Sequence, residues 1–173
     1  MRRPIVGIVG AGEASERSLR DARGLGWAVA RRGWIVLTGG RAAGVMAAAC
    51  AGAKEVPGSL TLGILPSDAG GVGPDVDVAV FTGMGDARNV VNVLTSDAVV
   101  ACGVEGAGTA SEVALALKSA KPVILLAAGE RATAFFRGLH GGERLLTAAS
   151  VEDTIHLLET EIGLRPMPGS SSS

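Results

Sequence analysis

Short apolar runs alternate with helix-length segments along most of the chain. The runs are rich in Val and Ile and are bounded by Gly, Pro or Asp, which is typical of strands buried on both faces of a parallel sheet. The expected strands are Ile5–Val9, Trp34–Thr38, Leu60–Leu65, Val76–Phe81, Ala98–Cys102 and Pro122–Ala127. The expected helices are Glu13–Arg32, Gly44–Lys54, Gly85–Ser96, Thr109–Ala120, Arg131–Leu139 and a closing helix capped by Ser150. This order predicts an α/β fold, a single doubly wound domain with a mainly parallel sheet.

Length and composition narrow the possible functions. The 173 residues suit one ligand-binding domain, which we place at residues 1–165, with 166–173 as a disordered tail. The net charge of −1 and scattered basic residues argue against nucleic acid as a partner. Cys50 and Cys102 lack metal or disulfide spacing, so both are expected to be buried. Neither a signal-peptide pattern nor an apolar stretch of roughly 20 residues occurs, which predicts a soluble cytoplasmic protein without a membrane partner.

Three glycine-rich loops follow expected strands: "VGAGEASE", "TGGRAAG" and "CGVEGAGTASE". In a doubly wound sheet, ligands bind beyond the carboxyl ends of the strands, where these loops would meet. Glycine allows close backbone approach, and the helix that follows offers unpaired N–H groups at its N-terminus. The three loops together predict a site for phosphate or another small anion.

A dinucleotide is the obvious alternative ligand. Gly10, Gly12 and Ser15 give only a degraded match to the G-x-G-x-x-G fingerprint. The second strand also ends in a double glycine followed by Arg41, where a nicotinamide-binding fold places an acidic residue for the ribose. NAD is therefore not expected.

The third loop leads into a helix whose first turn carries Thr109 and Glu112. Their spacing fits a capping box, in which each side chain pairs with a backbone amide of the helix start. The same placement also aims the Glu112 carboxylate at whatever the loop binds, and the pattern does not decide between the two. Val113 and Leu117 lie opposite Leu115, so this helix is apolar almost all round and predicts a subunit interface.

The "GMGDARNVVNVLTSD" segment sorts its residues by helical angle. One side is apolar and the other polar, with Arg88 and Asn92 stacked one turn apart. A solvated face is one interpretation, but two asparagines beside an arginine near a strand end favour the polar wall of a pocket. The apolar side holds Val90, Val91, Val93 and Leu94, and the polar side holds Arg88, Asn89, Asn92 and Ser96.

Three segments in this order and spacing, "TGGRAAGVMAAACAGAKE", "TGMGDARNVVN" and "GAGTASEVALALKSAKPVILL", resemble a known superfamily. It is the Rossmann-type, lysine decarboxylase-like superfamily, and within it the chain is most similar to the molybdenum cofactor carrier proteins of algae and cyanobacteria. The resemblance runs from about Pro4 to Leu158. It implies a homo-oligomer, a tetramer or else a dimer, that binds, protects and carries molybdenum cofactor (molybdopterin) and delivers it to molybdoenzyme recipients.

The same superfamily includes the cytokinin-activating phosphoribohydrolases of nucleoside 5′-monophosphates. Their P-G-G-x-G-T-x-x-E signature aligns with Val104 to Glu112, and the resemblance places their catalytic arginine and glutamate at Arg88 and Glu112. Two departures weaken this alternative: Val104-Glu105 replaces the Pro-Gly, and Asn89 replaces the lysine that follows the arginine.

A binding protein without chemical turnover is thus favoured over an N-glycosidic hydrolase, and no catalytic residue is assigned. No cluster of metal ligands is expected in the chain, and whether the ligand would carry Mo, W or no metal stays open. Glu105 either faces away or accepts from the amino group of the pterin. The predicted ligand-binding residues are Gly10, Ala11, Gly12, Thr38, Gly39, Gly40, Arg41, Gly44, Val45, Met46, Arg88, Asn89, Asn92, Gly106, Ala107, Gly108, Thr109 and Glu112.

Overall fold

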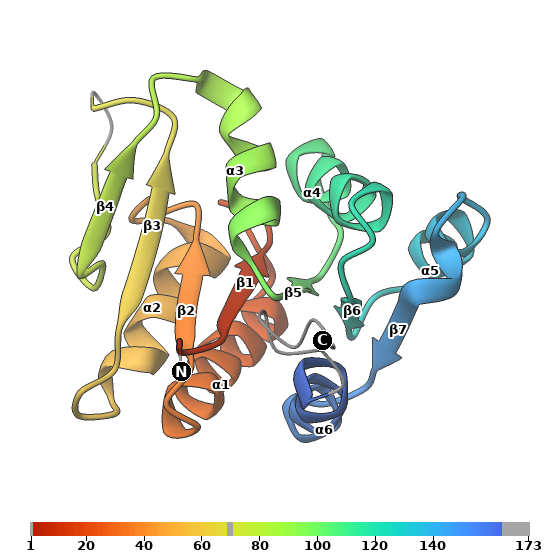
Figure 1. The fold of residues 1–173 in the computed structure, drawn as a ribbon, viewed down its shortest axis with the longest axis horizontal. Helices are drawn as coiled ribbons and strands as arrows, with labels where there is room; N and C mark the ends of the chain where they lie inside the picture. The colour runs from red at the N-terminus through yellow and green to blue at the C-terminus, as the bar shows by residue number, and fades with distance from the viewer. Residues whose placement is uncertain (1, 69–70, 164–173) are drawn as a thin grey trace, which may run out of the picture.

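The computed structural model describes residues 2–68 and 71–163, and within them seven strands form one sheet (Figure 1). The strands are β1 (Ile5–Val9), β2 (Ile35–Thr38), β3 (Thr61–Leu65), β4 (Val78–Phe81), β5 (Ala98–Cys102), β6 (Val123–Leu126) and β7 (Leu145–Ala148). The helices are α1 (Glu16–Arg31), α2 (Gly44–Lys54), α3 (Arg88–Thr95), α4 (Ala107–Lys118), α5 (Glu130–Arg137) and α6 (Val151–Gly163). Two short 3₁₀ turns, η1 (Gly85–Ala87) and η2 (Gly142–Arg144), complete the described elements.

The sheet is parallel throughout, in the order β4-β3-β2-β1-β5-β6-β7. The chain builds outward from the central strand β1 to the edge strand β4 and then returns to pair β5 with the other side of β1. The strand order therefore reverses between β1 and β5, which is the point where doubly wound folds bind ligands. The predicted doubly wound, Rossmann-like α/β fold is confirmed.

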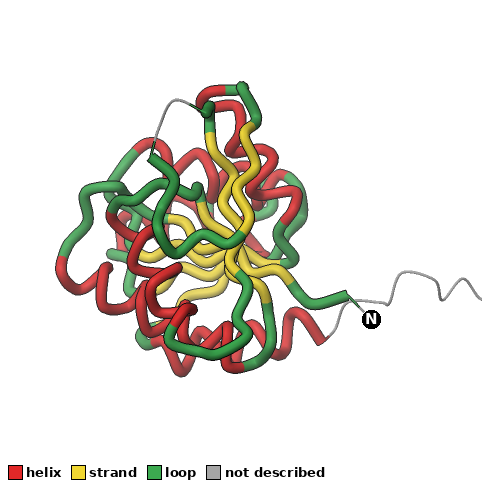
Figure 2. The backbone as a smooth tube through the Cα atoms, turned by 90° about the vertical axis from the view of Figure 1, so that its left-hand side faces the viewer, coloured by secondary structure: helices red, strands yellow, loops and turns green. Residues whose placement is uncertain are grey.

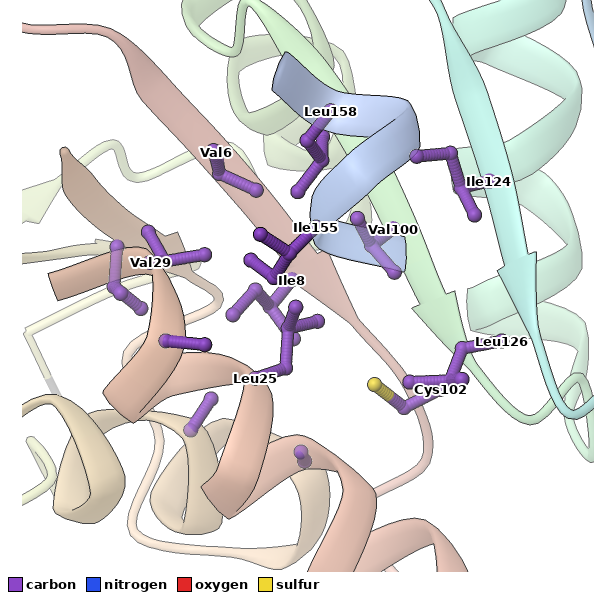
Figure 3. Packing of buried hydrophobic residues seen from close by; sticks show 14 of the residues in the cluster. Val6, Ile8, Leu25, Val29, Val100, Cys102, Ile124, Leu126, Ile155 and Leu158 are labelled. Atoms are coloured by element: carbon purple, nitrogen blue, oxygen red, sulfur yellow. The ribbon is translucent and has the colours of Figure 1, made fainter. Parts of the chain in front are cut away.

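Helices cover both faces of the sheet, and the tube view in Figure 2 shows them on either side of the strands. Alternate residues of β1, β5 and β6 enter different cores: Ile8 packs with α1 and α6, and Val9 packs with the opposite layer. Figure 3 shows the first core, where side chains of β1, β5 and β6 meet Leu25 of α1 and Leu158 of α6. Fully burying one such leucine contributes about 1.5–3 kcal/mol, which explains why these strands are almost continuously apolar.

Several helix ends differ from those expected. Helix α1 begins at Glu16 because the Oγ of Ser15 accepts from the N–H of Ser18 at 3.1 Å. The expected helix at 85–96 divides into η1 and α3. The cap of α6 is confirmed, since the Oγ of Ser150 accepts from the N–H of Asp153 at 3.1 Å.

Of the two interpretations of Thr109 and Glu112, the structure excludes the capping box. Helix α4 begins at Ala107, two residues earlier than expected, and its N-cap is Gly106, which has no side chain. Thr109 therefore lies inside the helix and cannot cap it. Glu112 consequently turns away from the helix start, and its side chain enters the site described below.

Strand β7 was not expected, and the chain between Leu139 and Ser150 carried no predicted element. The two cysteines are buried as expected, and burial raises the pKa of the Cys102 thiol to about 12. No helix in residues 2–68 and 71–163 has the length and apolar character needed to span a membrane. The predicted tail, 166–173, lies outside the described residues, so the proposed domain boundary stays a prediction.

Candidate functional site

A pocket of ≈ 250 Å³ opens at the carboxyl ends of β1 and β2, beside the N-termini of α3 and α4. Four parts of the chain line it: the end of β1 with the loop after it, the loop after β2 with the start of α2, η1 with the start of α3, and the start of α4. They meet here because the carboxyl ends of parallel strands share one edge of the sheet. The lining residues are Ile8, Val9, Gly10, Ala11, Gly12, Gly39, Arg41, Met46, Asp86, Arg88, Asn89, Gly106, Gly108, Thr109 and Glu112.

Arg88 forms the cationic floor of the pocket. Its side chain is only 8% exposed, and its Nη1 has no hydrogen-bond partner among the described residues. Burial lowers the pKa of the guanidinium, Arg41 lowers it further, and the charges of Glu112 and Asp86 oppose the shift. Unpaired buried charge is strongly disfavoured, so this group fits a site that a ligand anion completes.

Gly39 makes room for that guanidinium. A Cβ at this position would collide with Nη1 of Arg88 and lie 2.8 Å from the Sδ of Met46. The side chain of Arg88 therefore passes directly over the backbone at the end of β2. This close approach explains why a glycine stands here.

Glu112 brings the opposite charge to the same pocket. It is also 8% exposed, and its Oε1 accepts from the Nδ2 of Asn92 at 2.8 Å. Burial raises the pKa of the carboxyl group, while the hydrogen bond from Asn92 and the charges of Arg88 and Arg41 oppose the increase. The Oδ1 of Asn92 is itself buried and unpaired within the described part of the chain.

The start of α4 offers backbone amides to the pocket. Its N-cap, Gly106, contributes no side-chain cap, and the first helical hydrogen bond is donated by the N–H of Ala110 to the carbonyl of Gly106. The preceding N–H groups of the first turn thus have no partner inside the helix. Together with the helix dipole, they favour an anion near Gly106 and Gly108.

Twelve of the predicted residues lie on the pocket wall: Gly10, Ala11, Gly12, Gly39, Arg41, Met46, Arg88, Asn89, Gly106, Gly108, Thr109 and Glu112. The pocket also includes Ile8, Val9 and Asp86, which were not predicted. Asp86 stands two residues before Arg88, and its position in the polar "GDAR" sequence was the available signal. The two strand residues could not be distinguished from core positions by sequence.

Six predicted residues do not line the pocket: Thr38, Gly40, Gly44, Val45, Asn92 and Ala107. Thr38 instead stabilises the turn, since its Oγ1 accepts from the N–H of Gly40 at 3.1 Å. Gly44 packs against the carbonyl of Ala11, and the N–H of Val45 donates to that carbonyl at 3.1 Å, so this amide is not available to a ligand. Gly40, with φ of +75°, serves the turn, and Asn92 lies behind Glu112. Ala107 lies exposed at the first position of α4, outside the pocket wall.

Glu105 is not part of the pocket wall. Its Oε1 accepts from the Oγ of Ser18 at 3.5 Å, in the first turn of α1. A positive φ at Gly103, +74°, turns the chain after β5 and brings the carboxylate to that helix. Of the two alternatives for this residue, the geometry favours the one in which it faces away from the ligand.

Helix α3 separates polar from apolar residues as predicted, with the polar side facing inward. Arg88, Asn92 and Ser96 are buried, which supports a pocket wall rather than a solvated face. On the apolar side Val93 is buried, but Leu94 is 55% exposed, and Val90 is also exposed. The exposed residues of β4 and the turn after it, among them Phe81 and Met84, are apolar as well.

The acidic side chains of the pocket wall are Asp86 and Glu112. Within residues 2–68 and 71–163, no group of three or more His, Cys, Asp or Glu side chains is placed to hold a metal ion.

Solved structures of high similarity exist. The molybdenum cofactor binding protein from the phototrophic bacterium Rippkaea orientalis is 48% identical, with a TM-score of 0.89, over 94% of this chain and 99% of that protein. The molybdenum cofactor carrier protein from Chlamydomonas reinhardtii is 44% identical, with a TM-score of 0.86, over 93% of this chain and 99% of that protein.

A relative from Archaeoglobus fulgidus, an uncharacterized protein, is 41% identical over 121 residues, which are 70% of this chain and 78% of the relative. The family model described as the SLOG cluster4 family matches residues 3–155. That match covers all the described strands, and helix α6 down to residue 155. The chain therefore belongs to the SLOG cluster4 family.

Proposed function

We propose that the chain binds molybdenum cofactor, protects it and carries it without chemical turnover. The observation that carries the proposal is the buried, unpaired Nη1 of Arg88 at the floor of a pocket that also receives Arg41 and the start of α4. The similarity to two proteins described as binding or carrying this cofactor supplies the identity of the ligand. Molybdenum cofactor is a pterin with a phosphate and a dithiolene-held molybdenum oxide, so it presents several negative groups.

The chemistry of the donors fits such a ligand. A charge-assisted hydrogen bond from Arg88 to an anionic oxygen contributes about 1.5–3 kcal/mol. Amides at the start of α4 add donors that need no reorganisation, because the helix fixes their direction. When bound, the cofactor would bring its own metal, and the protein would supply only hydrogen bonds, charge and exclusion of water.

The proposal is tested by isolating the protein, without oxygen, from a host that makes the cofactor. We expect molybdenum, measured by mass spectrometry, and pterin, measured by fluorescence after oxidation, in about equal amounts. Arg88→Met should lower both by about tenfold or more, since it removes the charged donor. The control Arg131→Met changes an exposed arginine of α5 and should change neither amount.

The hydrolase alternative is tested with the same preparations. The two residues that this alternative needs, Arg88 and Glu112, lie in one pocket. AMP is a suitable test substrate because the alternative enzymes act on nucleoside 5′-monophosphates. Adenine released from AMP by the wild type, and lost in Glu112→Gln, would overturn the proposal of a carrier without turnover. Protein that contains neither molybdenum nor pterin would contradict the proposed ligand.

We further propose a homo-oligomer, a tetramer or a dimer, whose contacts use the exposed apolar residues of β4 and α3. Leu94, Phe81 and Met84 are each about half exposed in the single chain (55%, 49% and 49%). Exposed apolar side chains concentrated in one part of a chain are typical of subunit contacts. Leu115 of α4, predicted from sequence to face a partner, is partly buried and stays a prediction. The cytoplasmic location and the recipient molybdoenzymes also stay predictions.

A further inference from the structure

Two oppositely charged side chains are buried in the same pocket without forming an ion pair. Arg88 of α3 and Glu112 of α4 influence each other's pKa, but neither takes part in an ion pair within the described residues. Such a pair normally closes, because a buried charge without a partner is costly. Here the protein keeps one cation and one anion separately available.

Each side chain is held apart by its own neighbours. The guanidinium of Arg88 lies over the backbone of Gly39, where a side chain would collide with it. The carboxylate of Glu112 is held by the Nδ2 of Asn92, which is 2.8 Å from Oε1. Asn92 occupies only part of the accepting capacity, because an ionised carboxylate offers about four lone-pair positions. The arrangement leaves a donor at one side of the pocket and an acceptor at another.

The complementary ligand carries an anionic group for Arg88 and a pair of N–H donors for Glu112. A carboxylate pairs best with two parallel N–H groups, as it does with arginine. A pterin has such an edge, in which a ring N–H stands beside the 2-amino group, and guanine has the same edge. Adenine lacks it, because its amino group stands beside an acceptor nitrogen.

We propose that Glu112, positioned by Asn92, binds the edge formed by the ring N–H and the 2-amino group and so determines which heterocycle the pocket accepts. This inference rests on the proposed function, which makes a pterin the source of that edge. It also gives the ligand a direction, with the heterocycle towards α4 and the negative groups towards Arg88 and Arg41. Glu112 then serves as a specificity-determining residue, in a position where a hydrolase would use it on the ribose.

The test compares two ligands that differ by one group. Unsubstituted pterin and its analogue without the 2-amino group are titrated by fluorescence at pH 7 into wild type, Glu112→Gln and the exposed control Glu130→Gln. Wild type and control should prefer pterin by about 10- to 100-fold, because the analogue keeps only the ring N–H and leaves the buried carboxylate without the second of the two parallel donors. Glu112→Gln should lose that preference and bind inorganic phosphate at least as tightly as wild type, because it removes a negative charge near Arg88 but none of the donors to the anion.

Equal affinity of wild type for the two ligands, or an unchanged preference in Glu112→Gln, would overturn the inference. Failure of the proposed function is distinguishable, because wild type would then not bind pterin at all, whereas failure of the edge contact alone leaves pterin binding intact and abolishes only the preference over the analogue. Titrations with guanosine monophosphate and AMP test whether guanine, which has the same edge as pterin, is the heterocycle that Glu112 binds; AMP lacks the edge and serves as the control. Preference for guanosine monophosphate over both AMP and pterin would support the edge contact and overturn the pterin as its source.

Discussion

Arg88→Met separates the binding role of the guanidinium from the stability of the fold. The substitution keeps most of the aliphatic length of the side chain but removes a charge that is buried and partly unpaired. Leaving such a group unsatisfied costs about 1–3 kcal/mol, and removing it also deprives Glu112 of a nearby cation. We therefore expect the free energy of unfolding of the ligand-free protein to stay equal or to rise by up to about 2 kcal/mol.

In the presence of phosphate, the wild type should be stabilised more than Arg88→Met. At a phosphate concentration 100 times its dissociation constant, the wild type should gain about 2.7 kcal/mol in the free energy of unfolding, whereas Arg88→Met, which binds about tenfold more weakly or worse, should gain at most about 1.4 kcal/mol at the same concentration. Urea unfolding with and without phosphate measures both quantities, and Arg131→Met serves as the control. A variant that is much less stable without ligand, yet is stabilised by phosphate as strongly as wild type, would refute the reasoning.

Three further results are expected. Gly39→Ala should displace Arg88 and lower the affinity for phosphate by about tenfold in calorimetry, whereas the matched control Gly24→Ala in α1 should leave it unchanged and stabilise the helix by about 0.5–1 kcal/mol. Burial raises the pKa of Glu112 above its ordinary 4.5, so the free energy of unfolding should fall as pH rises from 4.5 through the raised pKa. In urea unfolding, Glu112→Gln should remove this fall of the free energy of unfolding with pH. A variant with the same pH dependence as wild type would contradict the assignment to Glu112. Leu94→Asp should shift the protein to a smaller species in light scattering after gel filtration; an unaltered mass would exclude α3 from the interface.

Much of the fold could be predicted because six of the strands are apolar on both faces. In β1, β2, β5 and β6 this pattern comes from burial under two helical layers, so it is present in the sequence itself, whereas β4 is apolar although its side chains are largely exposed. Strand β7 lacks this signal. Its four residues, Leu145–Ala148, include Thr and Ala, and the strand owes its conformation to pairing with the edge of β6.

The location of the candidate site could be predicted from the sequence, but several of its contacts could not. The three glycine loops had to converge, because they follow parallel strands of one sheet. Sequence could not tell that Gly44 and Val45 are occupied by contacts with Ala11, because that contact joins two loops distant in the chain. It also could not decide whether Glu112 capped its helix, since the answer depends on where α4 starts and on the position of Asn92.

The expectations about binding depend on an anion that Arg88 and the start of α4 hold in this pocket. A crystal structure of the protein grown with phosphate or molybdate tests this directly. We expect one well-ordered ion within hydrogen-bond distance of Nη1 of Arg88 and of amides at Gly106 to Thr109. An ion bound elsewhere, with Arg88 still unpaired at saturating concentration, would contradict it.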